Sequence, residues 1–174
     1  PLEGAAVATE PGRNGLVPDE LDVLVTREAQ RHHERPGPAL DASVVSFDKV
    51  NDIAVLRVAG LQARPLPLAD AVEGTPGGLL GYPGNGPYVE TPVRVGRVVR
   101  ITGRDAYGSF PTSRLVTTIR GVIRSGNSGG PVVDAQGRVI TTVFAQRAGT
   151  DGGYGVPTSV VRAAIAKAGT EALE

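Results

Sequence analysis

The chain has 174 residues, with 18 basic and 18 acidic side chains, two histidines, and no cysteine, methionine or tryptophan. This length suits a compact domain of one or two lobes, and no apolar run approaches the roughly 20 residues that span a bilayer. The missing cysteines exclude disulfides, thiolate nucleophiles and cysteine-based metal sites. Zero net charge argues against nucleic acid as a partner. With only two histidines, which are adjacent in the sequence, we expect no metal site and no cofactor.

The N-terminal 38 residues differ from the rest of the chain. Residues 1–16 are polar, rich in glycine and poorly patterned. From Pro18 the signals conflict, because the acidic residues after it are typical of a first helical turn. The apolar residues of the same stretch alternate as they do in a strand, at Leu21, Val23 and Val25. Periodicity leaves helix and strand open over so short a stretch.

Short strands are expected through the middle of the chain, because 24 glycines and 14 prolines divide it into short runs rich in Val, Ile, Leu and Thr. In chain order these strands are Ala42–Phe47, Asp52–Val58, Gly78–Leu80 running into Gly81, Val93–Ile101, Leu115–Ile123, Pro131–Val133 and Arg138–Ala145. The turn residues after Val133, from Asp134 to Gly137, predict a hairpin between the last two strands. Short strands without alternating helices indicate an all-β barrel or sandwich.

One helix is expected, at the C-terminus. Pro157, Thr158 and Ser159 predict its cap. An apolar stripe follows at Val160, Val161, Ala164, Ile165 and Ala168, and it ends at Gly169. We expect this stripe to dock against a barrel.

The segment Ser125–Pro131 is the most informative motif of the chain. Three glycines surround Ser128 and a proline closes the segment, so the serine is expected on a tight turn. Such a turn can aim the N–H groups of Gly126 and Ser128 at one point, as an oxyanion hole requires. The alternative is an ordinary glycine-rich hairpin.

An acidic residue, Asp52, stands at the head of the apolar strand that ends the motif Asn51–Leu56. A carboxylate there is either a capping or turn residue, or the group that orients a catalytic imidazole. The Ser128 turn later in the same chain favours the catalytic interpretation.

Together these motifs resemble the trypsin-like serine peptidases of the chymotrypsin fold, and most of all the bacterial HtrA-type and MarP-type periplasmic proteases. The resemblance covers roughly Leu40 to Gly169 and rests on Asn51–Leu56, Leu80–Gly84, Asp105–Gly108, Thr118–Arg120, Gly126–Pro131, Asp134–Ile140 and Val143-Phe144. It implies two antiparallel β-barrels with the active site in the cleft between them, followed by a C-terminal helix.

The same resemblance implies a serine endopeptidase that cleaves protein substrates through an acyl-enzyme. Ser128 would be the nucleophile and Asp52 the acid, with Gly126 and Ser128 as the oxyanion donors. It also implies an extracytoplasmic location, periplasmic or at the cell surface, and a protein or peptide as partner. MarP-type relatives carry membrane helices ahead of the protease domain, and this chain contains none.

The resemblance also predicts the division of the chain. Residues 1–38 form the irregular N-terminal segment, either a remnant or the start of the first barrel. The first barrel is expected in residues 39–85, the second in 86–157, and the C-terminal helix and tail in 158–174. The first barrel is short for this fold, which raises the alternative that strands are missing from it.

The general base has no clear position. The family carries its histidine in a Thr-x-x-His-Val-Val motif, and the matching position here is Ala29. His32 and His33 follow in a charged stretch, where they are either solvated side chains or a shifted base. A base outside this chain is the third alternative. The missing motif also keeps open a second function, a catalytically silent protease-fold module that binds peptides or a partner.

The resemblance also implies a substrate pocket between the segment before Ser128 and the strand after it. Its lining residues in that interpretation are Val122, Thr141 and Val143. The position that lies at the pocket base in the family is Val122 here and not an acid, so the resemblance implies a preference for small or apolar side chains over Arg or Lys.

Overall fold

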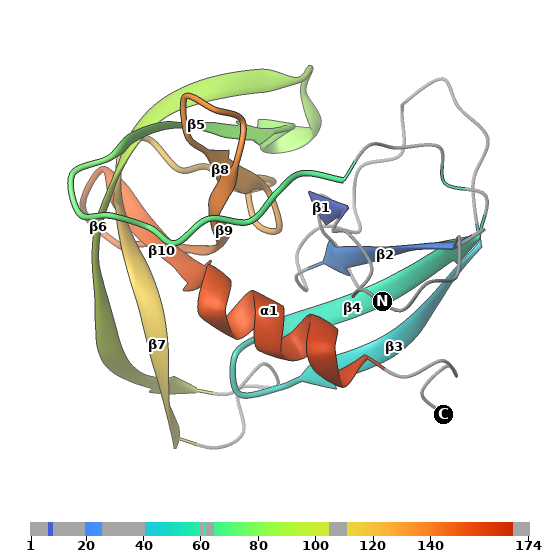
Figure 1. Cartoon of the computed structure of the whole chain (residues 1–174). Helices are drawn as coiled ribbons and strands as arrows, with labels where there is room; N and C mark the ends of the chain where they lie inside the picture. The colour runs from blue at the N-terminus through green and yellow to red at the C-terminus, as the bar shows by residue number, and fades with distance from the viewer. Residues whose placement is uncertain are drawn as a thin grey trace.

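The structure, a computed structural model, describes residues 7–8, 20–25, 41–59, 61, 65–104 and 111–168. Within these ranges it consists of two β-sheets and one helix (Figure 1). One sheet has four strands in the order β1-β2-β4-β3, and the other is a closed six-stranded barrel in the order β10-β7-β6-β5-β8-β9. The prediction of an all-β architecture with a C-terminal helix is therefore confirmed.

The four-stranded sheet is antiparallel throughout. Its strands are β1 (Val7–Ala8), β2 (Glu20–Val25), β3 (Ala42–Asp48) and β4 (Ile53–Ala59). The central strand β4 is apolar and buries the consecutive residues Ile53, Ala54 and Val55. Of the two interpretations left open after Pro18, the strand is correct, because β2 pairs with β4 along its full length. In the described part of the chain this sheet is not closed into a barrel.

The six-stranded barrel is also antiparallel. It contains β5 (Pro76–Gly81), β6 (Val89–Arg104), β7 (Pro111–Arg120), β8 (Pro131–Val133), β9 (Val139–Gln146) and β10 (Gly152–Pro157). The buried side chains that fill its interior are Leu79, Val93, Val95, Ile119, Ile123, Val132, Ile140 and Val143. The barrel takes in β5, which precedes the boundary expected between residues 85 and 86.

The expected β8–β9 hairpin is confirmed, since Pro131 pairs with Thr142 and Val132 with Thr141. Strand β10 is not among the expected strands, because it has glycine where strands usually carry apolar side chains. Packing explains this composition: a Cβ at Gly153 would lie 2.3 Å from the Ala145 carbonyl oxygen of the neighbouring strand. A strand whose glycines allow the neighbouring backbone to come close lacks the apolar side chains by which strands are recognised in a sequence.

The helix α1 (Thr158–Lys167) lies between the sheet and the barrel (Figure 1) and contacts β3, β4, β9 and β10. The expected side-chain cap is wrong: Pro157 is the N-cap residue and no side chain caps the helix. Instead, the Thr158 hydroxyl donates a hydrogen bond to Asp70 over 3.0 Å. Asp70 lies in the segment between the two sheets, so this bond ties the helix to that connection. No helix in the described ranges has the length and hydropathy to cross a membrane.

Candidate active site

The turn that carries Ser128 connects β7 to β8 and depends on glycine conformations. Gly126 has φ of +88° and Gly129 has φ of +84°, both in the left-handed region that favours glycine. Three N–H groups of the turn donate to backbone carbonyls: Asn127 to Arg124 over 3.0 Å, Gly129 to Val143 over 2.7 Å, and Gly130 to Asn127 over 2.9 Å. None of these three is one of the two N–H groups expected to form the oxyanion hole.

Asn127 holds the turn from inside. Its side chain is 1% exposed, and its Oδ1 accepts a 2.9 Å hydrogen bond from the Arg124 N–H. Because Asn127 both donates to and accepts from Arg124, the segment before Ser128 is fixed at two points. Gly130 must also be glycine, since a Cβ there would lie 2.5 Å from the Leu80 carbonyl oxygen.

Ser128 faces strand β9. Its side chain is 5% exposed, and its hydroxyl donates to the Phe144 carbonyl oxygen over 3.4 Å, a long hydrogen bond. The Phe144 ring in turn stacks against Tyr154 of β10, with 6.5 Å between the ring centroids. The serine is therefore bonded to a residue whose aromatic ring packs against the neighbouring strand β10.

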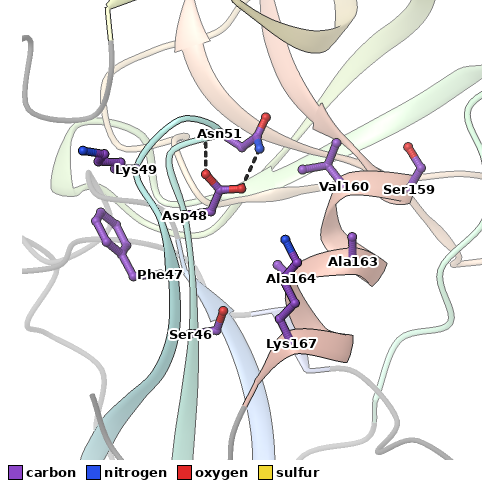
Figure 2. A pocket seen from close by; sticks show the side chains of 10 residues that line it. All are labelled: Ser46, Phe47, Asp48, Lys49, Asn51, Ser159, Val160, Ala163, Ala164 and Lys167. Atoms are coloured by element: carbon purple, nitrogen blue, oxygen red, sulfur yellow. Dashed lines mark hydrogen bonds between the residues drawn. The ribbon is translucent and has the colours of Figure 1, made fainter. Parts of the chain in front are cut away.

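Asp52 ends the turn between β3 and β4, in the four-stranded sheet. Its φ of +57° is unusual for a residue with a side chain, although aspartate tolerates it better than most. Asp48 builds this turn: its Oδ1 accepts from the N–H groups of Val50 (2.9 Å) and Asn51 (3.1 Å), and its Oδ2 accepts from the Asn51 side chain (2.6 Å). Figure 2 shows the Asp48 carboxylate directed into the turn toward Asn51.

Arg114 of β7 connects the Asp52 turn to the strand beneath Ser128. Its Nη1 donates to the Val50 carbonyl over 3.3 Å, and its guanidinium carbon lies 4.5 Å from the centre of the Phe144 ring. Burial lowers the pKa of Arg114, and the nearby negative charge of Asp52 opposes that shift. A guanidinium stays charged in either case. A continuous series of contacts therefore runs from the Asp52 turn through Arg114 and Phe144 to Ser128.

The three residues expected in the substrate pocket differ in exposure. Val122 is 37% exposed, whereas Thr141 and Val143 have no exposed surface. The Thr141 hydroxyl donates to the Val156 carbonyl over 2.9 Å, and the Val143 side chain is part of the barrel core. Val143 contributes to the site through its backbone, which is bonded to Gly129 and Gly130. Strand β9 thus buries both side chains, and the substrate pocket expected at these three residues stays a prediction.

A hollow of about 490 Å³ lies elsewhere, between the β3–β4 turn and α1 (Figure 2). The residues that line it are Ser46, Phe47, Asp48, Lys49, Asn51, Ser159, Val160, Ala163, Ala164 and Lys167. It includes none of the expected site residues.

His32 and His33, the two histidines considered as the base, lie outside the described residues, as does Asp105–Gly108. The described ranges contain no group of three or more His, Cys, Asp or Glu side chains that could hold a metal ion.

Comparison with known proteins identifies the family to which this chain belongs. Residues 9–141 match the model of the trypsin-like peptidase domain. The chain belongs to the trypsin-like peptidase family. The resemblance inferred from the motifs is therefore confirmed.

Individual relatives agree with the trypsin-like assignment. The chain is 42% identical over 107 residues to the serine protease Rv3671c of Mycobacterium tuberculosis, an alignment that covers 60% of this chain and 27% of that protein. The crystal structure of the active form of the Rv3671c protease matches with a TM-score of 0.79 at 31% identity, over 99% of this chain and 77% of that one. The HtrA-type protease AlgW, crystallised with a decapeptide, shares the fold with a TM-score of 0.66 at 22% identity, over 94% of this chain and 50% of that one.

This trypsin-like chain thus has the chymotrypsin-like fold, and it spans about a quarter of the length of the curated relative it matches (27%).

The roles of three residues near the site were missed by the sequence interpretation. Asp48 and Asn51 are spaced as in a turn in which an aspartate side chain accepts backbone N–H groups, and this signal was available. Arg114 had no signal, because its contact with Val50 joins residues 64 positions apart in the chain.

Proposed function

We propose that this chain is the protease domain of a serine endopeptidase, with Ser128 as the nucleophile. The observation that carries the proposal is the Ser128 turn. Its glycines adopt left-handed conformations, and its internal hydrogen bonds use the N–H groups of Asn127, Gly129 and Gly130. These bonds order the turn without drawing on the two N–H groups assigned to the oxyanion hole. Membership in the trypsin-like peptidase family supports the same reaction.

In the proposed mechanism the Ser128 hydroxyl attacks the carbonyl carbon of a peptide bond while an imidazole takes its proton. The tetrahedral oxyanion accepts hydrogen bonds from the Gly126 and Ser128 N–H groups. The imidazolium then gives its proton to the leaving amine, which leaves an ester on Ser128, and water hydrolyses this ester by the reverse proton transfers. Asp52 orients the imidazole and stabilises its charged form. His32 and His33 are the two imidazoles of this chain available for that role.

Covalent labelling with a fluorophosphonate probe tests the proposal. We expect the chain to gain the mass of one phosphonyl adduct on Ser128, because only a serine with an activated hydroxyl reacts with such probes. Ser128→Ala is the control and should not label. Separate His32→Ala and His33→Ala variants then identify the base, since the correct one should lower the labelling rate about 10³-fold or more. A folded, monodisperse wild type that never labels and cleaves no peptide would instead support the silent peptide-binding module.

We further propose that the protein acts outside the cytoplasm on protein substrates. The support is the similarity of its motifs to periplasmic proteases of the HtrA and MarP types. Fractionation of the source cells tests the location, and recovery of the chain in the cytoplasmic fraction alone would contradict it.

A further inference from the structure

We infer that Gly84, in the loop between β5 and β6, is a positioning residue that holds the oxyanion hole in its working orientation. The inference rests on the proposed function, because it concerns how the Gly126 N–H is aimed. The deciding contact is a 2.8 Å hydrogen bond from the Gly84 N–H to the carbonyl oxygen of Ser125. This bond joins the barrel's β5–β6 loop to the peptide unit immediately before Gly126.

The orientation of the Gly126 N–H follows from peptide geometry. The described chain contains no cis peptide bond, so the Ser125–Gly126 unit is trans. In a trans peptide the carbonyl and the N–H point in opposite directions. Because the Ser125 carbonyl points at Gly84, the Gly126 N–H points away from that loop. The Gly84 bond therefore decides which face of this peptide unit is turned toward the anion.

The opposite orientation of the Ser125–Gly126 peptide unit is accessible, because glycine at position 126 restricts the backbone little. Glycine adopts both signs of φ at little cost, so its own conformation does not prevent the preceding peptide from rotating. A half-turn of this unit would replace the N–H donor by the Ser125 carbonyl oxygen, an acceptor that repels an oxyanion. The bond from Asn127 to Arg124 and its side-chain counterpart fix the two sides of this unit, but neither involves its carbonyl or N–H.

Gly84 can make its bond because of its own backbone conformation. It has φ of +62° within the short 3₁₀ turn Pro83–Asn85. The turn closes with a 3.0 Å bond from the Gly86 N–H to the Pro83 carbonyl. At the base of the loop, the rings of Tyr82 and Tyr88 meet edge to face, with 5.7 Å between their centroids. The loop is thus anchored, and the left-handed residue at its tip presents the N–H to Ser125.

A matched series of substitutions isolates the backbone from side-chain bulk. A Cβ at Gly84 would find no atom within 4 Å, so a side chain meets no steric obstacle there. Asparagine tolerates the left-handed region, alanine does so less well, and a β-branched valine is a strong outlier in it. Activity that follows the order Gly, Asn, Ala, Val would report the backbone conformation at this position.

The experiment measures kcat and KM on a peptide substrate, the rate of fluorophosphonate labelling and the unfolding midpoint for each variant. Loss of one oxyanion donor costs about 10²-fold to 10³-fold in kcat, so we expect Gly84→Val to approach that loss with KM nearly unchanged. Gly84→Asn should stay within about threefold of the wild type, and Gly84→Ala should fall between them. Should Gly84→Val fail to fold, the comparison of Gly84→Ala with Gly84→Asn carries the test.

Two results would overturn the inference while leaving the proposed function intact. In one, the wild type labels normally and all the variants keep its kcat. In the other, Gly84→Asn loses as much activity as Gly84→Ala, which would assign the effect to the side chain. A wild type that never labels is the separate failure of the proposed function.

Discussion

Asp52 meets two requirements in one residue: it carries the carboxylate proposed to orient the imidazole, and it has a left-handed backbone at the end of the β3–β4 turn. A residue other than glycine at φ of +57° costs about 1 kcal/mol, and Asp and Asn bear this cost best. The Asp48 carboxylate offsets it by ordering the preceding turn through three hydrogen bonds. The charge of Asp52 and its conformation can therefore be separated by substitution.

Asp52→Asn keeps the left-handed tolerance but removes the charge that stabilises an imidazolium. We expect turnover to fall about 10⁴-fold, the size of this effect in Ser-His-Asp peptidases, with a small fall in the urea midpoint because Arg114 loses the nearby negative charge. Asp52→Ala should lose the same activity and about 1 kcal/mol more unfolding free energy than Asp52→Asn, because alanine tolerates the left-handed region less well. An Asp52→Asn variant with wild-type kcat would remove Asp52 from the mechanism.

At the scale of one element, the β8–β9 hairpin is closed by Asp134. Its Oδ1 accepts 2.9 Å hydrogen bonds from the N–H groups of both Gln136 and Arg138, and its Oδ2 accepts from the Arg138 guanidinium at 2.8 Å. Burial raises the pKa of Asp134, but the bonds from Arg138 and Gln136 outweigh it, so the pKa is lowered below its usual 3.8. This carboxylate thus stabilises the fold more when it is ionised.

The stability that Asp134 adds should therefore be complete above about pH 5 and disappear as the pH falls through its lowered pKa. Asp134→Asn keeps an oxygen for the turn but loses the charge, so we expect it to cost about 1 kcal/mol at pH 7, allowing for the half-exposed Arg138. Urea unfolding at pH 7 and at pH 3 measures the difference, which should shrink at the lower pH. Asp151→Asn, at an exposed site, is the control. A pH-independent difference would contradict the ionic contribution.

Elements differ in how far the sequence could predict them, and the reason is the range of the interactions involved. The β8–β9 hairpin and the Ser128 turn were predictable, because their glycine, asparagine and aspartate residues act on the backbone within a few positions. Strand β10 was not predictable, because its glycines are required by the close approach of the strands on either side of it. The burial of Thr141 and the bonding of Thr158 to Asp70 were missed for the same reason.

At the scale of the molecule, the two described sheets share one of the hydrophobic core clusters. Its buried residues come from the four-stranded sheet (Val45, Ile53, Val55), from the barrel (Val116, Val139, Phe144, Val156) and from α1 (Val161, Ala164). The connection between the sheets also joins the barrel, because Val139 donates to the Pro67 carbonyl and accepts from the Ala69 N–H. The acid and the serine come from different sheets, so their relative placement depends on this common core.

Val161 belongs to that core and has no exposed surface. Truncation to Ala removes two methyl groups and leaves a cavity, so we expect Val161→Ala to cost about 2 kcal/mol of unfolding free energy. The unfolding transition should remain single, and amide hydrogens in β4 and in β9 should lose protection together. Val72→Ala is the control, since Val72 is 68% exposed. Separate transitions for the two sheets would show that the shared core does not couple them.

The hollow between the β3–β4 turn and α1 has a chemical consequence. Lys49 and Lys167 both line it, and they are the only lysines of the chain, all other basic side chains being arginines. Side-chain amines react with acylating and alkylating reagents under conditions that leave guanidinium groups unchanged. A dye, an affinity tag or a surface linker attached through lysine is therefore placed beside this hollow. The Ser128 turn contains no lysine, so such reagents do not modify an amine there.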